Sequence, residues 1–291
     1  MTYVKESLNT FFDEVISIVD SCTLEKEMPN IKNFKSILYL SFAAFLQYYG
    51  YENIDIIYDS FLNTSFNEIN LKPKKSIINF QLPAYIRTRY QEEDGKILLE
   101  DHMNIINNRY VDIKTWLNFF IHEMNHVVNS KNNRVIDDRY IRCGISIYDV
   151  KKKTDINKGI NEAFNTLQTE EIENLVYLFS KEKIVTPYFY QILKKIRKCE
   201  HLEHEYEPYP LRTHIIRPLY ENKGFKKIYE ERTLDGCIDE IEYEFDKKTY
   251  KNAFSDLSNL IDQCNDDIGI DEQRDTVVKA KTIVKRYIVN T

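Results

Sequence analysis

The chain has 291 residues, of which 43% are hydrophobic, so it is long and apolar enough to bury a sizeable core. Its formal net charge is −6, whereas a general nucleic-acid binder would be more basic. The five cysteines are widely spaced and contain no C-x-x-C pair, which argues against a disulfide scaffold and against a cysteine-based zinc ribbon.

The N-terminal third is predicted to be helical. Residues 3–22 carry apolar side chains at helical spacing, residues 34–49 are apolar almost all round, and residues 53–62 are expected to form a short helix. Acidic residues interrupt the first of these segments, so it does not have the apolar centre of a signal peptide, and no apolar run reaches the roughly 18 residues of a membrane span. We therefore expect a cytoplasmic protein with reduced thiols and no membrane partner, although export without a signal sequence would leave the same pattern.

The next segments are predicted to be strands. Residues 77–91 and 96–106 are rich in β-branched and aromatic residues, and Asp94-Gly95 between them is a hairpin-turn signal. Pro83 cannot donate a hydrogen bond within a sheet, so the first strand is expected to be an edge strand or to carry a bulge. Residues 134–150 have the same strand-like texture.

Helices are predicted around and after these strands. One follows Asp112 and runs to about Ser130, and another runs from about Asn157 to about Ser180. Four more are expected over residues 187–199, 211–222, 247–264 and 272–288. The order of elements predicts an α+β fold that is mostly helical, with a small mixed or antiparallel sheet beside the helix of residues 112–130.

Three regions are distinguished along the chain. They are a helical N-terminal region (1–72), a central region (73–222) and a helical C-terminal region (223–291). Because no linker composition separates them, we expect the three regions to form one compact unit.

The helix of residues 112–130 contains an H-E-x-x-H pattern formed by His122, Glu123 and His126. Two histidines four positions apart lie on one helix face, one turn apart, where both imidazoles can bind one zinc ion. Glu123 lies about a third of a turn further round, so it can approach a water molecule on that ion and act as a general base. The alternative is a core helix that contains two histidines by chance.

A third ligand is needed, and Glu162 is the best candidate. Residues 127–140 contain no histidine, which excludes the three-histidine class, and Asp137 and Asp138 are the rival ligands there. Glu162 lies 36 positions after His126, near the start of the next predicted helix and between apolar residues. A buried carboxylate needs a partner, and a metal ion would be one. The alternative is an acidic residue favoured by the helix dipole.

The H-E-x-x-H pattern followed on a later helix by Asn161-Glu162-Ala163 resembles the gluzincin metallopeptidases. The resemblance implies a zincin-like core over residues 73–222, with zinc bound by His122, His126 and Glu162. It also implies hydrolysis of a peptide or protein substrate, with water activated by Glu123. The long gap is similar to that of the clostridial neurotoxin light chains, of lethal-factor-like and pro-pro endopeptidases, and of uncharacterised bacterial and phage proteins.

The match covers roughly residues 110–220 and departs from the family in one respect. Those enzymes often carry a threonine or an acidic residue one turn after the glutamate ligand, where it orients a histidine. Here Asn165 and Thr166 are the side chains available for that role.

Peptide hydrolysis also needs a donor for the negative charge that develops on the carbonyl oxygen. Tyr209 is our first candidate, because it begins a segment that resembles the tyrosine-led helix of the phage and bacterial relatives. Arg217 with Tyr220, and Tyr148, are the alternatives. The chain has 21 tyrosines, most of which must serve packing alone.

Other polar clusters are interpreted as solvated surface. Residues 199–207 (CEHLEHEYE) contain two histidines among glutamates, but their spacing matches no established metal motif. The basic residues at 151–153 and near the C-terminus lack the interleaved aromatic residues of nucleic-acid platforms.

The sequence therefore predicts a zinc metallopeptidase whose edge strand, within residues 77–91, holds an extended peptide by β-augmentation. Three alternatives stay open. They are a zinc-dependent regulator that acts on one partner, a toxin-like or effector-like endopeptidase, and a catalytically silent scaffold with structural zinc. Three convincing ligands rather than four favour catalysis, because a catalytic zinc keeps an open position.

Overall fold

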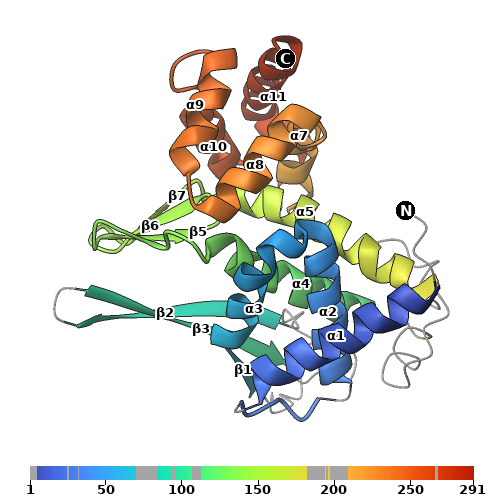
Figure 1. Ribbon diagram of the computed structural model, residues 1–291. Coiled ribbons are helices and arrows are strands. Elements are labelled where there is room, and N and C mark those ends of the chain that lie inside the picture. Colours follow the sequence, from blue (N-terminus) through green and yellow to red (C-terminus); the bar gives the residue numbers. More distant parts are fainter. Residues whose placement is uncertain are drawn as a thin grey trace, which may run out of the picture. The chain divides into compact units, whose positions relative to one another are not determined.

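The structure is a computed structural model that describes residues 5–24, 26–31, 33–69, 84–93, 96–106, 113–181, 194, 196, 209–265 and 268–291 (Figure 1). The chain divides into two units that interleave along the sequence. Unit 1 comprises Met1–Asp94, Leu98–Asn125 and Thr169–Glu205, and unit 2 comprises Gly95–Ile97, His126–Gln168 and Tyr206–Thr291. Two long helices, α4 (Ile113–Ser130) and α5 (Lys158–Lys181), contribute residues to both units.

The fold is α+β and mostly helical, which confirms the predicted class. Within the described residues the strands form two small sheets, one of three strands and one of four. None of the helices in the described ranges combines the length and the apolar content needed to cross a membrane.

Unit 1 begins with the three predicted helices, α1 (Lys5–Thr23), α2 (Phe34–Tyr49) and α3 (Ile54–Asn63). Helix α2 is buried on nearly every side, as its sequence predicts. It ends at Gly50, whose φ of 86° suits a residue without a side chain. Phe42 and Phe61 pack edge to face with ring centroids 5.2 Å apart, which joins α2 to α3.

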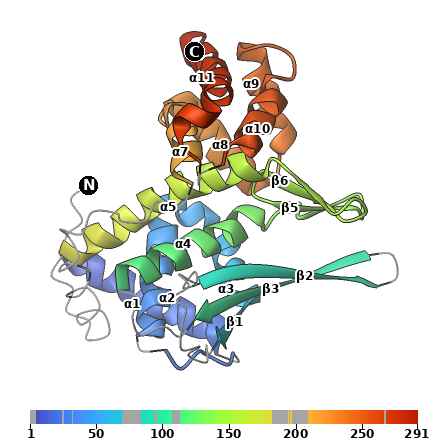
Figure 2. The ribbon, with the colours of Figure 1, turned by 180° about the vertical axis from the view of Figure 1, so that it is seen from behind.

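The three-stranded sheet of unit 1 has the order β1 (Thr64–Ile69), β3 (Lys96–Ile106), β2 (Ala84–Glu93). Strands β1 and β3 are parallel, with Thr64 opposite Asp101. Strand β1 was not predicted. Both ribbon views show β2 and β3 running side by side (Figures 1 and 2). Among the described strands β2 forms one edge of this sheet, as expected, while residues 77–83 and the Asp94-Gly95 turn lie outside the described residues.

Helix α4 packs one face against aromatic residues of unit 1. Trp116 and Phe120 stack with centroids 5.7 Å apart, and the Phe34 ring meets both of them edge-on. The ring centroid of Phe66, in β1, lies 6.2 Å from that of Phe120. These contacts bury the helix that carries the H-E-x-x-H pattern. Its predicted cap, Asp112, lies outside the described residues.

The four-stranded sheet of unit 2 is an antiparallel meander, which confirms the strand-like texture of residues 134–150. Its strands are β4 (Val135–Ile136), β5 (Tyr140–Cys143), β6 (Ser146–Asp149) and β7 (Thr154–Ile156). The chain then enters α5, within one residue of the predicted start.

The rest of unit 2 is helical, and Figure 2 shows these helices gathered together. They are α7 (Pro210–Tyr220), α8 (Lys223–Asp235), α9 (Ile238–Lys248), α10 (Ala253–Gln263) and α11 (Arg274–Val289). A short 3-10 turn at Ile270–Gln273 precedes α11, and unit 1 has a similar turn at Tyr51–Asn53. The helix predicted over 247–264 starts too early, because the chain breaks between α9 and α10, where Asn252 is left-handed with φ 67°. Helices α8 and α9 fall within the region 223–291 that was predicted to be helical, but neither was predicted individually. Most of the segment 187–199 lies outside the described residues.

The core of unit 2 surrounds the first half of α5. Phe164 lies 4.3 Å from the ring of Tyr229 and 5.6 Å from that of Phe225, both on α8. Phe245 and Tyr287 stack with centroids 4.9 Å apart and extend the same core to α9 and α11. This packing fixes the segment of α5 that carries Glu162.

Candidate metal centre

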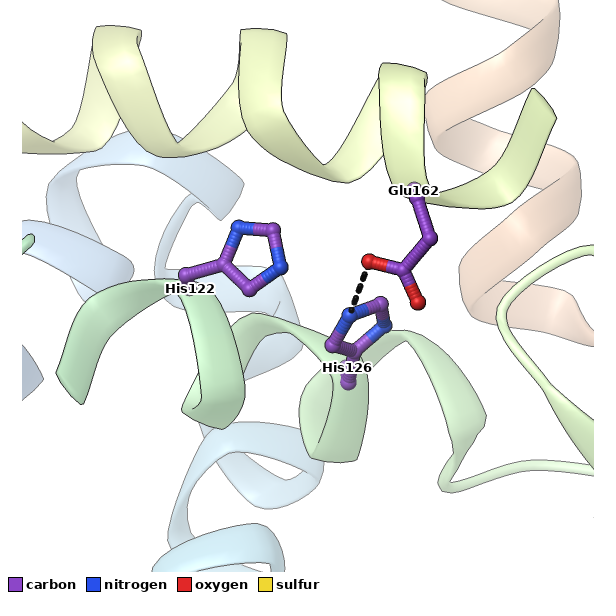
Figure 3. A group of neighbouring side chains, drawn as sticks. All are labelled: His122, His126 and Glu162. Atoms are coloured by element: carbon purple, nitrogen blue, oxygen red, sulfur yellow. Dashed lines mark hydrogen bonds and ion pairs between the residues drawn. The ribbon is translucent and has the colours of Figure 1, made fainter. Parts of the chain in front are cut away.

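His122, His126 and Glu162 come together as predicted. Each offers one ligand atom, and these three atoms all lie within 4.8 Å of one another. The two histidines project from successive turns of α4, and Glu162 projects from the first turns of α5. Figure 3 shows both rings and the carboxylate directed toward a common point. The group could therefore hold a metal ion.

The three side chains are shielded from water. His122 and His126 are each 6% exposed, and the side chain of Glu162 is 16% exposed. Nε2 of His126 lies 3.2 Å from Oε2 of Glu162. Burial alone would lower the pKa of His126, but the nearby Glu162 carboxylate and Cys143 thiol raise that pKa well above its usual value.

This donor set suits a divalent cation. Two imidazole nitrogens and one carboxylate oxygen are common ligands of catalytic zinc and of other first-row metals. A buried carboxylate beside an imidazole already attracts a proton, and a metal ion would compete with that proton for the same nitrogen. The residues present therefore fit a metal ion, without selecting one metal.

Glu123 lies outside the ligand group and contacts the sheet instead. Its Oε2 accepts a 2.9 Å hydrogen bond from the backbone N–H of Ile86, in strand β2. The amide of Ile86 therefore points from this strand toward Glu123. The sheet thus lies beside the H-E-x-x-H helix, as the sequence predicted.

Three asparagines fix α4 through polar contacts. Asn125 accepts a 2.6 Å hydrogen bond from the Tyr49 hydroxyl, and the Asn129 amide donates to Gln168 at 2.8 Å. Asn118 donates to Glu173 at 3.1 Å. Such pairing makes asparagine tolerable on a buried helix, because an unsatisfied amide there would be costly. No motif in the sequence marks these three residues.

The side chains around Glu162 serve the backbone. Asn161 Oδ1 accepts a 2.9 Å hydrogen bond from the N–H of Ile145, at the turn between β5 and β6. The Thr166 hydroxyl donates to the backbone carbonyl of Glu162 at 2.9 Å. Thr166 thus supports the helix turn that carries the ligand.

Cys143 is a neighbour of the centre that sequence reasoning missed. Its sulfur lies 3.8 Å from Nδ1 of His126, the ring nitrogen that does not face Glu162. No local pattern marks this cysteine, which lies 17 positions after His126. The only hint in the sequence is Gly144, which immediately follows it and permits a tight turn.

The candidates for the oxyanion donor lie in different settings. Tyr209 precedes α7 in a left-handed conformation with φ 60°, and the Arg212 guanidinium lies 5.2 Å from its ring centroid. Tyr220 is buried in the core of unit 2, with its ring centroid 6.2 Å from that of Phe164. Tyr148 pairs with Ile141 within the meander. The role of Tyr209 stays a prediction.

The rival ligands are placed elsewhere. Asp137 and Asp138 are exposed turn residues with φ 50° and 45°, and neither belongs to the ligand group found among the described residues. The histidine-rich stretch 199–207 lies outside the described residues.

Comparisons with protein-family models, curated proteins and solved structures returned no match. The resemblance to gluzincins therefore rests on the motif and its spacing, and it stays a prediction. The geometry of the site carries the functional inference.

Proposed function

We propose that this protein is a zinc-dependent peptidase of gluzincin type. The observation that supports the proposal best is the convergence of His122, His126 and Glu162 within 4.8 Å, in a shielded position. Glu162 comes from a different helix, 36 positions from His126, and its side chain is only 16% exposed, so it is not an ordinary surface acid. Three ligands also leave a position open for substrate, as catalytic zinc sites require.

When bound there, zinc would supply a Lewis acid that polarises the substrate carbonyl and lowers the pKa of a water molecule. The protein's own residues do the rest. The two imidazoles and the carboxylate hold the ion, and apolar residues of α4 such as Phe120 and Ile121 exclude bulk water from the helix behind it.

Glu123 is the proposed general base. It is next to a ligand in sequence, outside the ligand group and only partly buried, so its carboxylate can accept a proton from the attacking water and pass it to the leaving amine. The Ile86 amide donates to one carboxylate oxygen and thereby orients the base.

Strand β2 is the proposed binding site of the substrate. It is an edge strand among the described strands, its side chains are mostly exposed, and its Ile86 amide points toward Glu123. An extended peptide that adds to this edge would run past the base. Backbone hydrogen bonding of this kind suits a protein or peptide substrate better than a small molecule.

The test compares wild type, Glu123→Gln and Glu231→Gln. Glu231 is an exposed residue of α8 that forms an ion pair with Lys227, so its variant controls for the loss of one carboxylate. Metal content is measured by elemental analysis, and cleavage is followed by mass spectrometry on a proteome-derived peptide library. We expect about one zinc per chain in all three proteins, with cleavage reduced roughly 10²–10⁴-fold in Glu123→Gln alone.

Two results would contradict the proposal. A wild-type protein without stoichiometric metal removes its basis. Zinc in all three proteins with no cleavage by any of them would instead identify a silent zinc-binding scaffold.

A further inference from the structure

The tight turn between β5 and β6, residues 143–145, joins the two helices that carry the ligands. The N–H of Gly144 donates to the Ser130 hydroxyl oxygen at 3.0 Å, at the end of α4. The next N–H, of Ile145, donates to Asn161 at 2.9 Å, at the start of α5. The turn is therefore held to both helices by consecutive backbone amides, and Cys143 enters it from strand β5.

The imidazole of His126 is contacted at both nitrogens. Nε2 faces Oε2 of Glu162 at 3.2 Å, and Nδ1 faces the sulfur of Cys143 at 3.8 Å. An imidazole that binds a metal through Nε2 carries its proton on Nδ1 and needs an acceptor for it. Among the described contacts of His126 Nδ1, the acceptor is the sulfur of Cys143. In most metal-binding histidines this acceptor is a carboxylate, a carbonyl oxygen or a water molecule.

We propose that Cys143 is the positioning residue of this metal centre. Its sulfur accepts the Nδ1–H of His126, which fixes the tautomer and the ring orientation that direct Nε2 toward the metal. This inference rests on the proposed function insofar as that function requires a metal at the site. It adds a residue that neither the H-E-x-x-H pattern nor the glutamate helix contains.

The thiol is well placed for this role because its frame is rigid. Ser130 accepts from Gly144 and donates through the same hydroxyl to the backbone carbonyl of His126. The backbone of His126 and the β5–β6 turn are thereby linked through the side chain of Ser130. The backbones of His126 and of the turn are held at a fixed separation, which keeps the sulfur within reach of the ring.

The experiment measures zinc affinity by chelator competition in wild type, Cys143→Val, Cys143→Ser and Cys237→Ala. Valine fills a similar volume without an acceptor, and serine keeps an acceptor. Cys237 is a partly buried cysteine at the start of α9 whose sulfur lies 3.9 Å from the backbone carbonyl oxygen of Asp235. We expect zinc affinity to fall about 10-fold in Cys143→Val, to fall less in Cys143→Ser, and to stay unchanged in Cys237→Ala.

Two further readouts separate positioning from general damage. The melting temperature of the metal-free protein should be similar in wild type and Cys143→Val. In the zinc-loaded proteins, the Nδ1 proton of His126 should exchange with water faster in Cys143→Val than in wild type, as measured by nitrogen-15 NMR of the imidazole.

Wild-type zinc affinity and unchanged proton exchange in Cys143→Val would overturn the inference while leaving the peptidase proposal standing. Equal losses of affinity in the valine and serine variants, with a lowered melting temperature, would also overturn it, since packing would then explain the effect. A wild-type protein that binds no zinc would instead overturn the metal centre itself.

Discussion

At the scale of single residues, Arg142 shows how a buried charge can be accommodated by backbone alone. Its side chain is fully buried, yet its guanidinium donates to the carbonyl oxygens of Asn129 at 2.8 Å, Gly144 at 2.7 Å and Thr233 at 3.2 Å. Burial lowers the pKa of Arg142 to about 10, so it stays charged at neutral pH. Arg142 therefore links the end of α4 and the end of α8 to the β5–β6 turn, residues 143–145.

Replacing Arg142 should destabilise the protein strongly. Arg142→Met leaves several buried carbonyl oxygens without a donor, and we expect a loss of about 3 kcal/mol or more in the free energy of unfolding, measured with urea. Arg274→Met, at an exposed position at the start of α11, is the matched control and should change stability by less than about 0.5 kcal/mol. Similar values for the two variants would show that water replaces the guanidinium without cost.

Single residues also mark the limit of sequence-based prediction. His122, His126 and Glu162 were predicted because two lie one helix turn apart and the third is an acid in an apolar setting. Cys143 and Arg142 were missed because their partners are backbone and ring atoms brought close by the register of β5 and β6. No spacing rule along the chain encodes that register.

At the scale of elements, the β5–β6 turn depends on Gly144. Its φ is +58°, a conformation that costs other residues energy, and an added Cβ would overlap Oδ1 of Asn161. The side chain that would be displaced is the one that anchors α5 beside its ligand.

We therefore expect Gly144→Ala to lower the free energy of unfolding by about 2 kcal/mol and to weaken zinc binding as well. Gly269→Ala serves as the control, because φ at Gly269 is −59° and nothing lies within 4 Å of the added methyl group. Urea unfolding and chelator competition measure the two effects. Unchanged zinc affinity in a destabilised Gly144→Ala protein would show that the turn supports the fold but not the centre.

Elements differed in how well their sequences predicted them. Helix α2 and the H-E-x-x-H helix have long apolar faces and were predicted to within a residue or two. Helices α8 and α9 are short and rich in Lys and Glu, and only a few of their residues are buried, so their periodicity was hidden by charge. Strand β1 is six residues long and half polar, and its pairing with β3 comes from a segment over thirty positions away.

At the scale of the whole molecule, metal binding should appear as added stability. A ligand that binds only the folded state stabilises it by about 2.7 kcal/mol at a hundredfold excess over its dissociation constant, which corresponds to roughly 5 °C for a chain of this size. We expect zinc to raise the melting temperature and a chelator to reverse the change.

The control for this shift is His122→Ala, which removes one ligand from the group. Its metal-free melting temperature should lie near that of the wild type, and the response to zinc should be much smaller. If zinc raised the melting temperature of both proteins equally, the ion would be binding at another place on the chain.

The hydrogen bond between Ile86 and Glu123 has a consequence for how the chain tolerates change. Its donor is a backbone amide, so every replacement at position 86 except proline preserves it. The Glu123 carboxylate, proposed as the base, is thus oriented by a backbone amide that almost no substitution removes. Under the proposed function, the exposed side chains of β2 can change, and with them the choice of peptide, without altering the orientation of the base.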